Sequence, residues 1–285
     1  MSNDLKMEGN IAEFAKEMKK IINNKEHSDV KFKIGPNRKA FYAHRCILSA
    51  RSAIFKALFA EQTPNRDVEI PLPDTSPEIF QAMLEFMYTN CVSLTPKIAL
   101  DTFGVSIEYG LDELRKLAAL YLVENLSVHN ACECLQVAVT YSNIELLGAT
   151  LRFIEEHTEA VLKSKAFQEL SDESMNEILQ SDNLQMDEIE LLKYVKDWAT
   201  INSTVLEKSV SEVARKVIPK IRFSLLSPEE LEKIEKDNKK DNLIPIDCFN
   251  NSWRFHATKK GDPSNPLMKR RKGTENRDHL KYLDQ

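Results

Sequence analysis

The segment that decides the fold is FYAHRCILSARSAIF at residues 41–55, together with SDVKF at 28–32 just before it. Apolar residues alternate with lysines over 30–34, which predicts a strand with one buried face. The sequence GPN at 35–37 is typical of a turn, and a return strand is expected directly after it. From 47 to 59 the apolar residues recur at helical spacing. This part of the chain therefore predicts a hairpin that leads into short helices.

The residues that follow predict mostly helix. A short strand is expected at 68–70, and Ser76-Pro77 begins a helix that reaches 88, with the serine as N-cap and the proline in the first turn. Two more helices are expected between 95 and 122. Beyond 124 the strand signals vanish, and helices are expected at 128–142, 144–157, 171–180, 187–200 and 206–219, with a short one after 228. The expected fold class is α+β: a small mixed sheet with a helical cluster, then an all-α stack, mostly helical overall.

These signals divide the chain into three parts. The α/β unit is expected to span 11–123, including a helix at its start, and the helical stack is expected to span 124–236. From 237 to 285 the periodicity fails, and Lys, Asn, Asp and Pro dominate. We expect this last part to be a basic, flexible tail, or else an extended arm.

The helix at the start of the α/β unit carries one apolar stripe. Ile11, Phe14, Met18 and Ile21 recur at helical spacing on it, and Asn10 is a suitable N-cap. Such a stripe must be buried against something. It packs either on its own domain or on a partner subunit.

Composition and charge exclude several classes of protein. The 285 residues carry a formal charge of −5, but the last 50 residues are net positive at +5, which leaves −10 on the rest. A negative body argues against nucleic-acid binding by the folded part. No run of 18 apolar residues occurs, so no membrane span is expected. The five scattered cysteines indicate reduced thiols in the cytosol or nucleus.

The sequence offers no sign of catalysis or of a metal site. It contains no glycine-rich phosphate loop, no G-x-S-x-G elbow and no H-E-x-x-H motif. Cys132 and Cys134 lie two apart on a predicted helix and point to different sides, so they are expected to be buried thiols. We therefore predict a protein that is not an enzyme and binds no cofactor.

The segments at 28–32 and 41–55 closely resemble the core signature of the BTB/POZ domain. The resemblance continues through IPLPD at 70–74 and through the segment at 109–114. The helical part resembles a BACK domain, in ENL at 124–126 and in Trp198 among others. No kelch-like repeat, MATH-like domain or zinc-finger spacing accompanies the two. The resemblance to the BTB/POZ–BACK family implies a module for protein–protein interaction.

The resemblance also implies a homodimer. BTB domains that dimerise carry a helix just before the first strand, packed against the partner chain, and Ile11, Phe14, Met18 and Ile21 stand in that place. Asp29 and Arg45 match positions that form a charged pair at the dimer floor in the family. The sequence leaves open whether the partner is a second copy or another BTB chain.

A BTB–BACK pairing further implies an adaptor that recruits a substrate to a cullin-3 ubiquitin ligase. Phe59 and Glu61 match the hydrophobic-x-Glu element that contacts the cullin, and Tyr88 matches the aromatic residue that does the same. Phe59 is equally well explained as a core residue. The loop at 61–67 is shorter than in established cullin adaptors, which favours the alternative of a scaffold or transcriptional co-regulator that binds peptide partners without cullin.

The tail holds the remaining candidate residues. Lys269, Arg270, Arg271 and Lys272 form a basic run that has three interpretations: a nuclear address, a nucleic-acid contact or a solvated tail. We expect the protein in the cytoplasm, and in the nucleus as well if this run is an address. The identity of the substrate or partner protein is not encoded in any motif.

Overall fold

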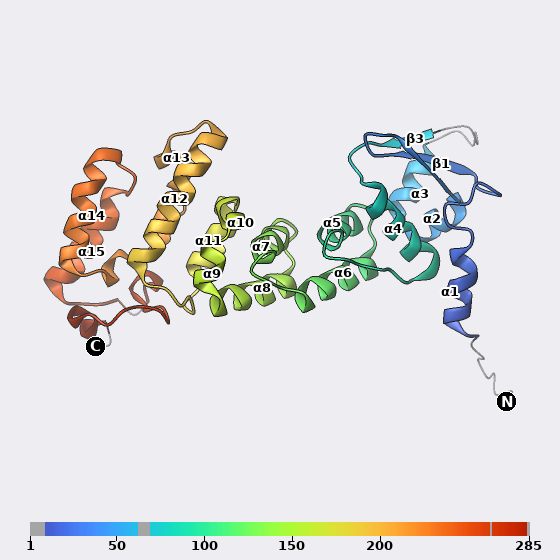
Figure 1. Cartoon of the computed structure of the whole chain (residues 1–285). Helices are drawn as coiled ribbons and strands as arrows, with labels where there is room; N and C mark the ends of the chain where they lie inside the picture. The colour runs from blue at the N-terminus through green and yellow to red at the C-terminus, as the bar shows by residue number, and fades with distance from the viewer. Residues whose placement is uncertain (1–8, 62–68, 263, 284–285) are drawn as a thin grey trace, which may run out of the picture. The chain divides into compact units, whose positions relative to one another are not determined.

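The computed structural model describes residues 9–61, 69–262 and 264–283. The chain divides into two compact units, 1–125 and 126–285. Among the described residues, the first unit contains a small sheet with helices and the second contains helices alone (Figure 1). The expected α+β class with a helical second part is therefore confirmed. In these ranges we find no helix of the length and hydropathy that crossing a membrane requires.

The sheet of the first unit is mixed, with the strand order β2-β1-β3. β1 (Val30–Ile34) pairs antiparallel with β2 (Lys39–Ala43) and parallel with β3 (Glu69–Leu72). Phe32 lies opposite Phe41 in β2 and opposite Ile70 in β3, so buried side chains from all three strands share one face.

Helices cover this face and bury aromatic rings against it. The Phe32 ring lies 5.9 Å from that of Phe55 and 5.1 Å from that of Phe80, and Phe55 stacks on Tyr109 at 4.7 Å. Such aromatic pairs each add about 0.5–1.5 kcal/mol beyond the area that they bury. The helices of the first unit are α1 (Ile11–Lys19), α2 (Arg45–Arg51), α3 (Ala53–Ala60), α4 (Pro77–Thr89), α5 (Ala99–Glu108) and α6 (Asp112–Glu124).

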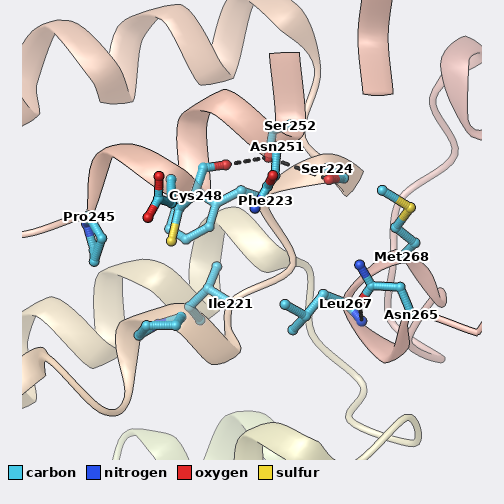
Figure 2. Close-up of a pocket in the computed structure, with 12 residues that line it drawn as sticks. Ile221, Phe223, Ser224, Pro245, Cys248, Asn251, Ser252, Asn265, Leu267 and Met268 are labelled. Atoms are coloured by element: carbon cyan, nitrogen blue, oxygen red, sulfur yellow. Dashed lines mark hydrogen bonds between the residues drawn. The ribbon is translucent and has the colours of Figure 1, made fainter. Parts of the chain in front are cut away.

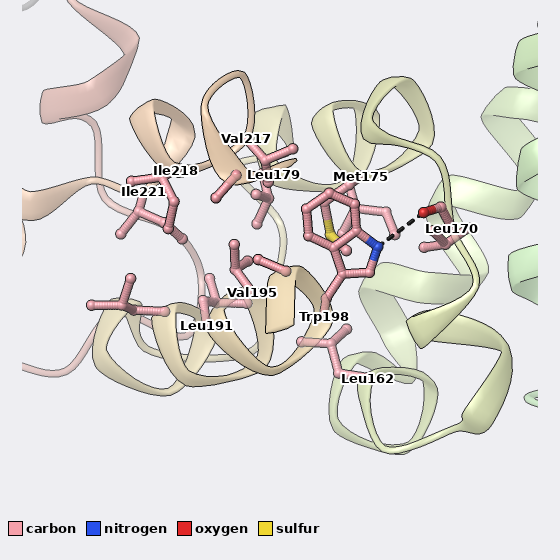
Figure 3. Packing of buried hydrophobic residues seen from close by; sticks show 14 of the residues in the cluster. Leu162, Leu170, Met175, Leu179, Leu191, Val195, Trp198, Val217, Ile218 and Ile221 are labelled. Carbon is pink, nitrogen blue, oxygen red and sulfur yellow. Dashed lines mark hydrogen bonds between the residues drawn. The ribbon is translucent and has the colours of Figure 1, made fainter. Parts of the chain in front are cut away.

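The second unit packs its helices around Trp198 (Figure 3). The indole is 2% exposed and donates its Nε1–H to the carbonyl of Leu170 at 2.9 Å, so its one polar group is satisfied inside the core. The elements are α7 (Ala131–Thr140), α8 (Ile144–Glu156), α9 (Thr158–Leu162), α10 (Lys165–Gln168), α11 (Asp172–Gln180), α12 (Glu188–Leu206), α13 (Val210–Ala214), η1 (Ile218–Lys220), η2 (Phe223–Leu225), α14 (Pro228–Asp241), α15 (Ile246–Thr258), η3 (Pro266–Met268) and η4 (Asp278–Tyr282).

The sequence predicts a flexible tail from 237 onward, and this prediction is wrong for the described residues. Helix α14 continues through 237, and α15 lies beside it (Figure 1). Phe249, Phe255 and Leu280 are 1–2% exposed. Sequence patterns do not predict the helices of this part, because it is mostly polar. Its few apolar residues are nevertheless spaced so that they face the core of the unit. We call residues 259–283 the C-terminal arm.

One buried carboxylate connects the C-terminal arm to the rest of the unit. Glu188, in the first turn of α12, accepts the Nε–H of Arg271 at 2.5 Å and the backbone N–H of Arg222 at 2.9 Å. The side chains of both Glu188 and Arg271 are 0% exposed. Because water is excluded on both sides, each charge depends on the other for its stabilisation.

A close approach of backbones brings Arg271 to this position. The N–H of Gly273 donates to the carbonyl of Leu184, and that of Lys272 to the carbonyl of Asp182. A Cβ at Gly273 would lie 2.0 Å from the nitrogen of Met186 and 2.4 Å from the carbonyl carbon of Gln185. Only glycine fits against this backbone.

We predict that Arg271→Ala destabilises the second unit by about 3–5 kcal/mol, because it leaves the Glu188 carboxylate buried without its partner. Both tryptophans of the chain, Trp198 and Trp253, belong to this unit. Urea unfolding of the full chain, followed by tryptophan fluorescence, therefore measures the loss directly. The matched control is Lys236→Ala, which removes an exposed pair with Glu232 on α14 and should leave the midpoint unchanged. Equal effects of the two substitutions would contradict the role of the buried pair.

Candidate functional site

Helix α1 is held to the first unit along only part of its apolar stripe. Met18 and Ile21 pack against the core, and Lys19 forms an ion pair with Glu85 of α4 at 2.6 Å. Phe14 and Ile11, one and two turns before Met18 in the helix, are 61% and 71% exposed. The stripe that the sequence predicts is therefore split between a partly buried end and an exposed end.

The exposed end of α1 borders an apolar groove of about 400 Å³. The floor and walls come from α1, α2 and α4, and include Phe14, Cys46, Ile47 and Met87. Large apolar side chains exposed beside an apolar groove are typical of protein interaction surfaces. We call this surface the α1 groove.

The predicted charged pair of Asp29 and Arg45 takes a different form. The Asp29 carboxylate accepts the backbone N–H of Arg45 at 2.7 Å, and the Arg45 Nε–H donates to the backbone carbonyl of Asp29 at 3.3 Å. The first of these bonds caps the N-terminus of α2, where no local side chain does so. Asp29 therefore ties the start of the hairpin to α2, and the guanidinium lies 5.1 Å from the centre of the Phe59 ring.

Tyr88 supports the junction between the hairpin and α2 from the buried side. Its hydroxyl lies 2.9 Å from both the backbone nitrogen and the Nδ1 of His44, so it accepts one hydrogen bond and can donate the other. Tyr88 is 4% exposed, and burial raises its pKa to about 12. The phenol therefore stays protonated at neutral pH. His44 is a structural residue in this arrangement.

The three residues suggested for cullin contact do not form one exposed surface. Phe59 is 9% exposed and stacks on Phe55, and Tyr88 is buried as described. Glu61 is exposed at the end of α3. The short loop at 61–67 lies outside the described residues from 62 onward. Phe59 instead faces the core on the buried side of α3, and the sequence analysis missed the exposed face of this helix.

The basic run at 269–272 is largely committed to the second unit. Arg271 is buried against Glu188, Arg270 donates to the carbonyl of Leu280 at 2.7 Å, and Lys269 pairs with Asp182. The side chain of Lys272 is exposed. The run is therefore not a freely solvated tail, because three of its four side chains hold the C-terminal arm in place.

A second cavity, of about 290 Å³, lies in the second unit between η2, α15 and η3 (Figure 2). Its walls are mainly apolar, with Ile221, Phe223 and Leu267 among them. Burial raises the pKa of the Cys248 thiol at its edge to about 11, so this thiol stays protonated and is a weak nucleophile. In the described ranges no group of three or more His, Cys, Asp or Glu is placed to hold a metal ion.

Comparison with known proteins assigns each of the two units to a domain family. The family model of the BTB/POZ domain matches residues 18–126, and that of the domain described as BTB And C-terminal Kelch (BACK) matches 131–236. The chain therefore belongs to the family of proteins in which a BTB/POZ domain precedes a BACK domain. Both are domains for protein interaction, in agreement with the exposed α1 groove.

Within this family the chain is similar to BTB/POZ domain-containing protein 19, which its length and layout also favour. It is 37% identical to that protein from Bos taurus and from Homo sapiens, over 98% of this chain and 97% of each relative. It is 31% identical to BTB/POZ domain-containing protein 9 of Drosophila melanogaster over 71% of this chain, which is 28% of that longer protein.

We predict that Tyr88→Phe destabilises the first unit by about 1–2 kcal/mol, because the part-buried backbone N–H of His44 loses its acceptor. Amide hydrogen exchange of the β1 strand measures this loss, since those amides open only when the sheet does. The amides of α12 in the same sample are the internal control and should not change. Unchanged protection of β1 would show that the Tyr88 hydroxyl supports nothing.

Proposed function

We propose that this protein is a non-enzymatic interaction module that forms a homodimer through the α1 groove and recruits cullin-3 through its BTB unit. The observation that supports dimerisation is the split stripe of α1. Ile11 and Phe14 stay exposed where they line an apolar groove together with Met18. Burying each of these two side chains would contribute about 1.5–3 kcal/mol.

A second copy suits this surface better than an unrelated protein. An exposed apolar helix end next to an apolar groove is self-complementary, because each chain supplies one helix and one groove. A two-fold axis through the surface repeats every contact twice, and two-fold dimers are the commonest oligomers. A different BTB chain is the other partner that such a surface accepts.

We predict that Phe14→Asp weakens self-association at least about 100-fold, because a carboxylate would enter an apolar contact that occurs twice in a symmetric dimer. Analytical ultracentrifugation of the full chain measures the dissociation constant. The matched control is Ile144→Asp in the second unit, where Ile144 is 83% exposed on α8 and should be neutral. A monomeric wild-type protein would disprove the homodimer, and mixing with other BTB chains would then test the heterodimer.

The exposed face of α3 supports the cullin contact. Ile54 is 49% exposed, and Ala57 and Glu61 lie one and two turns further along the same face. An apolar side chain followed by an acid on one exposed helix face suits a helical partner surface with an apolar centre and a basic rim. The proposed contact therefore moves from the buried Phe59 and Tyr88 to this face.

We predict that the N-terminal domain of cullin-3 binds the full chain with a dissociation constant of about 10 µM or tighter, and that Ile54→Asp with Glu61→Lys weakens binding at least about 30-fold. Isothermal titration calorimetry measures both. The control variant is Ile144→Asp with Glu232→Lys, which changes two exposed residues of the second unit in the same way. Absence of heat with a folded dimer would rule out the adaptor.

A scaffold that binds peptide partners without cullin is the second candidate function. The burial of Phe59 and Tyr88 favours it, because two of the three residues that the family resemblance assigns to cullin are not free to make that contact. Nuclear localisation is proposed only with this candidate. The test of nuclear localisation is the variant Lys272→Gln. Removal of the whole C-terminal arm is unsuitable, because it would also delete Arg271 and expose the Glu188 carboxylate. Unchanged nuclear signal in that variant would exclude Lys272 as part of an address.

A further inference from the structure

Two histidines meet where the C-terminal arm packs on α15. His256 lies near the end of α15 and His279 lies in η4, and the centres of their rings are 4.5 Å apart. The Nε2 of His256 lies 3.1 Å from the carbonyl of Leu226, and that of His279 lies 3.3 Å from the carbonyl of Ser224. A neutral ring that donates its Nε2–H to a carbonyl takes up a second proton at Nδ1.

The same contact helps to hold η4 in place, together with the hydrogen bond from Arg270 to the carbonyl of Leu280 at 2.7 Å and with Lys259, whose Nζ lies 5.2 Å from the centre of the Tyr282 ring. Leu280 of η4 is 1% exposed, and the Phe255 ring of α15 lies 6.1 Å from that of His279. The backbone N–H groups of Leu280 and Leu283 donate within the arm at 3.0 Å, so their exchange with solvent reports whether η4 is ordered.

Charged groups surround the pair unevenly. Glu229 and Glu230 approach from α14 and favour a protonated imidazole, whereas Arg277 of the C-terminal arm opposes it. Each protonated ring also opposes protonation of the other. These four influences cover α14, α15 and the arm. At η2 the rings face the main-chain carbonyls described above.

The balance of these influences favours neutral rings. Burial lowers the pKa of His256, and burial together with the neighbouring His256 lowers the pKa of His279. The pKa of each histidine is therefore lower when η4 is docked than when it is free. Docking is most stable above the free pKa of about 6.5, where the imidazoles are neutral in both states. The stability of docking falls as the pH drops from about 6.5 toward the pKa of the docked state.

We propose that the His256–His279 pair is a pH-sensitive latch, which keeps η4 docked on α15 while both imidazoles are neutral and releases it when both become protonated. Release exposes Leu280 and the covered side of α15. It changes the surface of the second unit without unfolding its core around Trp198.

The release is confined to the residues after Arg277. Arg277 donates to Asp187 at 2.8 and 2.9 Å and to Glu230 at 2.9 and 3.0 Å. Burial alone would raise the pKa of both acids, but the Arg277 guanidinium holds each below its usual value. The clamp therefore persists at a pH where the histidines are already charged, and Arg271 remains in the core.

Amide hydrogen exchange of the full chain between pH 7.5 and 5.5, corrected for the intrinsic pH dependence of exchange, tests the latch. We expect the protection of the Leu280 and Leu283 amides to fall about tenfold or more over this range, while amides of α12 stay constant. In the variant H256Q/H279Q the fall should be less than twofold, because glutamine can keep a hydrogen bond to the carbonyl but does not titrate. The matched control His129→Gln changes an exposed histidine and should retain the full response. Constant protection in the wild type, or an equal fall in H256Q/H279Q, would disprove the latch.

A second measurement covers the case in which H256Q/H279Q is open at every pH. In His256→Gln, the titration of His279 is followed by NMR of the imidazole Hε1. Removing the neighbouring ring should move the His279 midpoint to higher pH than in the wild type. An unchanged midpoint would show that the two rings do not couple and would overturn the proposal.

Discussion

The second unit depends on one carboxylate that has no water around it. Glu188 accepts hydrogen bonds from the backbone of Arg222 and the side chain of Arg271, so it joins the start of α12, the segment before η2 and the C-terminal arm. Few contacts constrain a fold as strongly, because a buried charge without its partner costs far more than an exposed one. The position of Arg271 in turn requires the close backbone approach at Gly273, and it brings Arg277 to Asp187 and Glu230.

The first unit uses its polar groups for a different purpose. Asp29 caps α2 across the hairpin and the Tyr88 hydroxyl fixes His44, so the junction between sheet and helices is rigid from within. Rigid support lets α1 expose Ile11 and Phe14 without losing its position, since Met18, Ile21 and the Lys19–Glu85 pair hold the other end. A preorganised apolar helix end lowers the entropy that a partner must overcome on binding.

Local patterns in the sequence predict local structure only. The predictions that are confirmed concern local elements, and those that are wrong concern residues far apart in the chain. The alternation at 30–34 and the Ser76-Pro77 start signal lie within a few residues of the elements that they predict, and β1 and α4 form there. Arg271 and Glu188 are 83 positions apart, and a basic run that is buried has the same local composition as one that is solvated. The roles of Phe59 and Tyr88 follow a family pattern, which indicates position in the fold but not which side of a surface a ring occupies. The exposed face of α3 becomes evident only when the side chains are placed.

The distance in sequence between Glu188 and Arg271 also bears on how the protein is made. When the segment around Glu188 leaves the ribosome, most of the C-terminal arm has still to be synthesised. Asp187 and Glu188 therefore lack their partners Arg277 and Arg271 during that interval. The sheet and helices of the first unit make their contacts within the first 125 residues and are free to fold during that interval. The second unit gains these contacts only after Arg271 and Arg277 have been synthesised. A chain that ends before Arg271 would therefore carry a folded BTB domain attached to an unfinished helical unit.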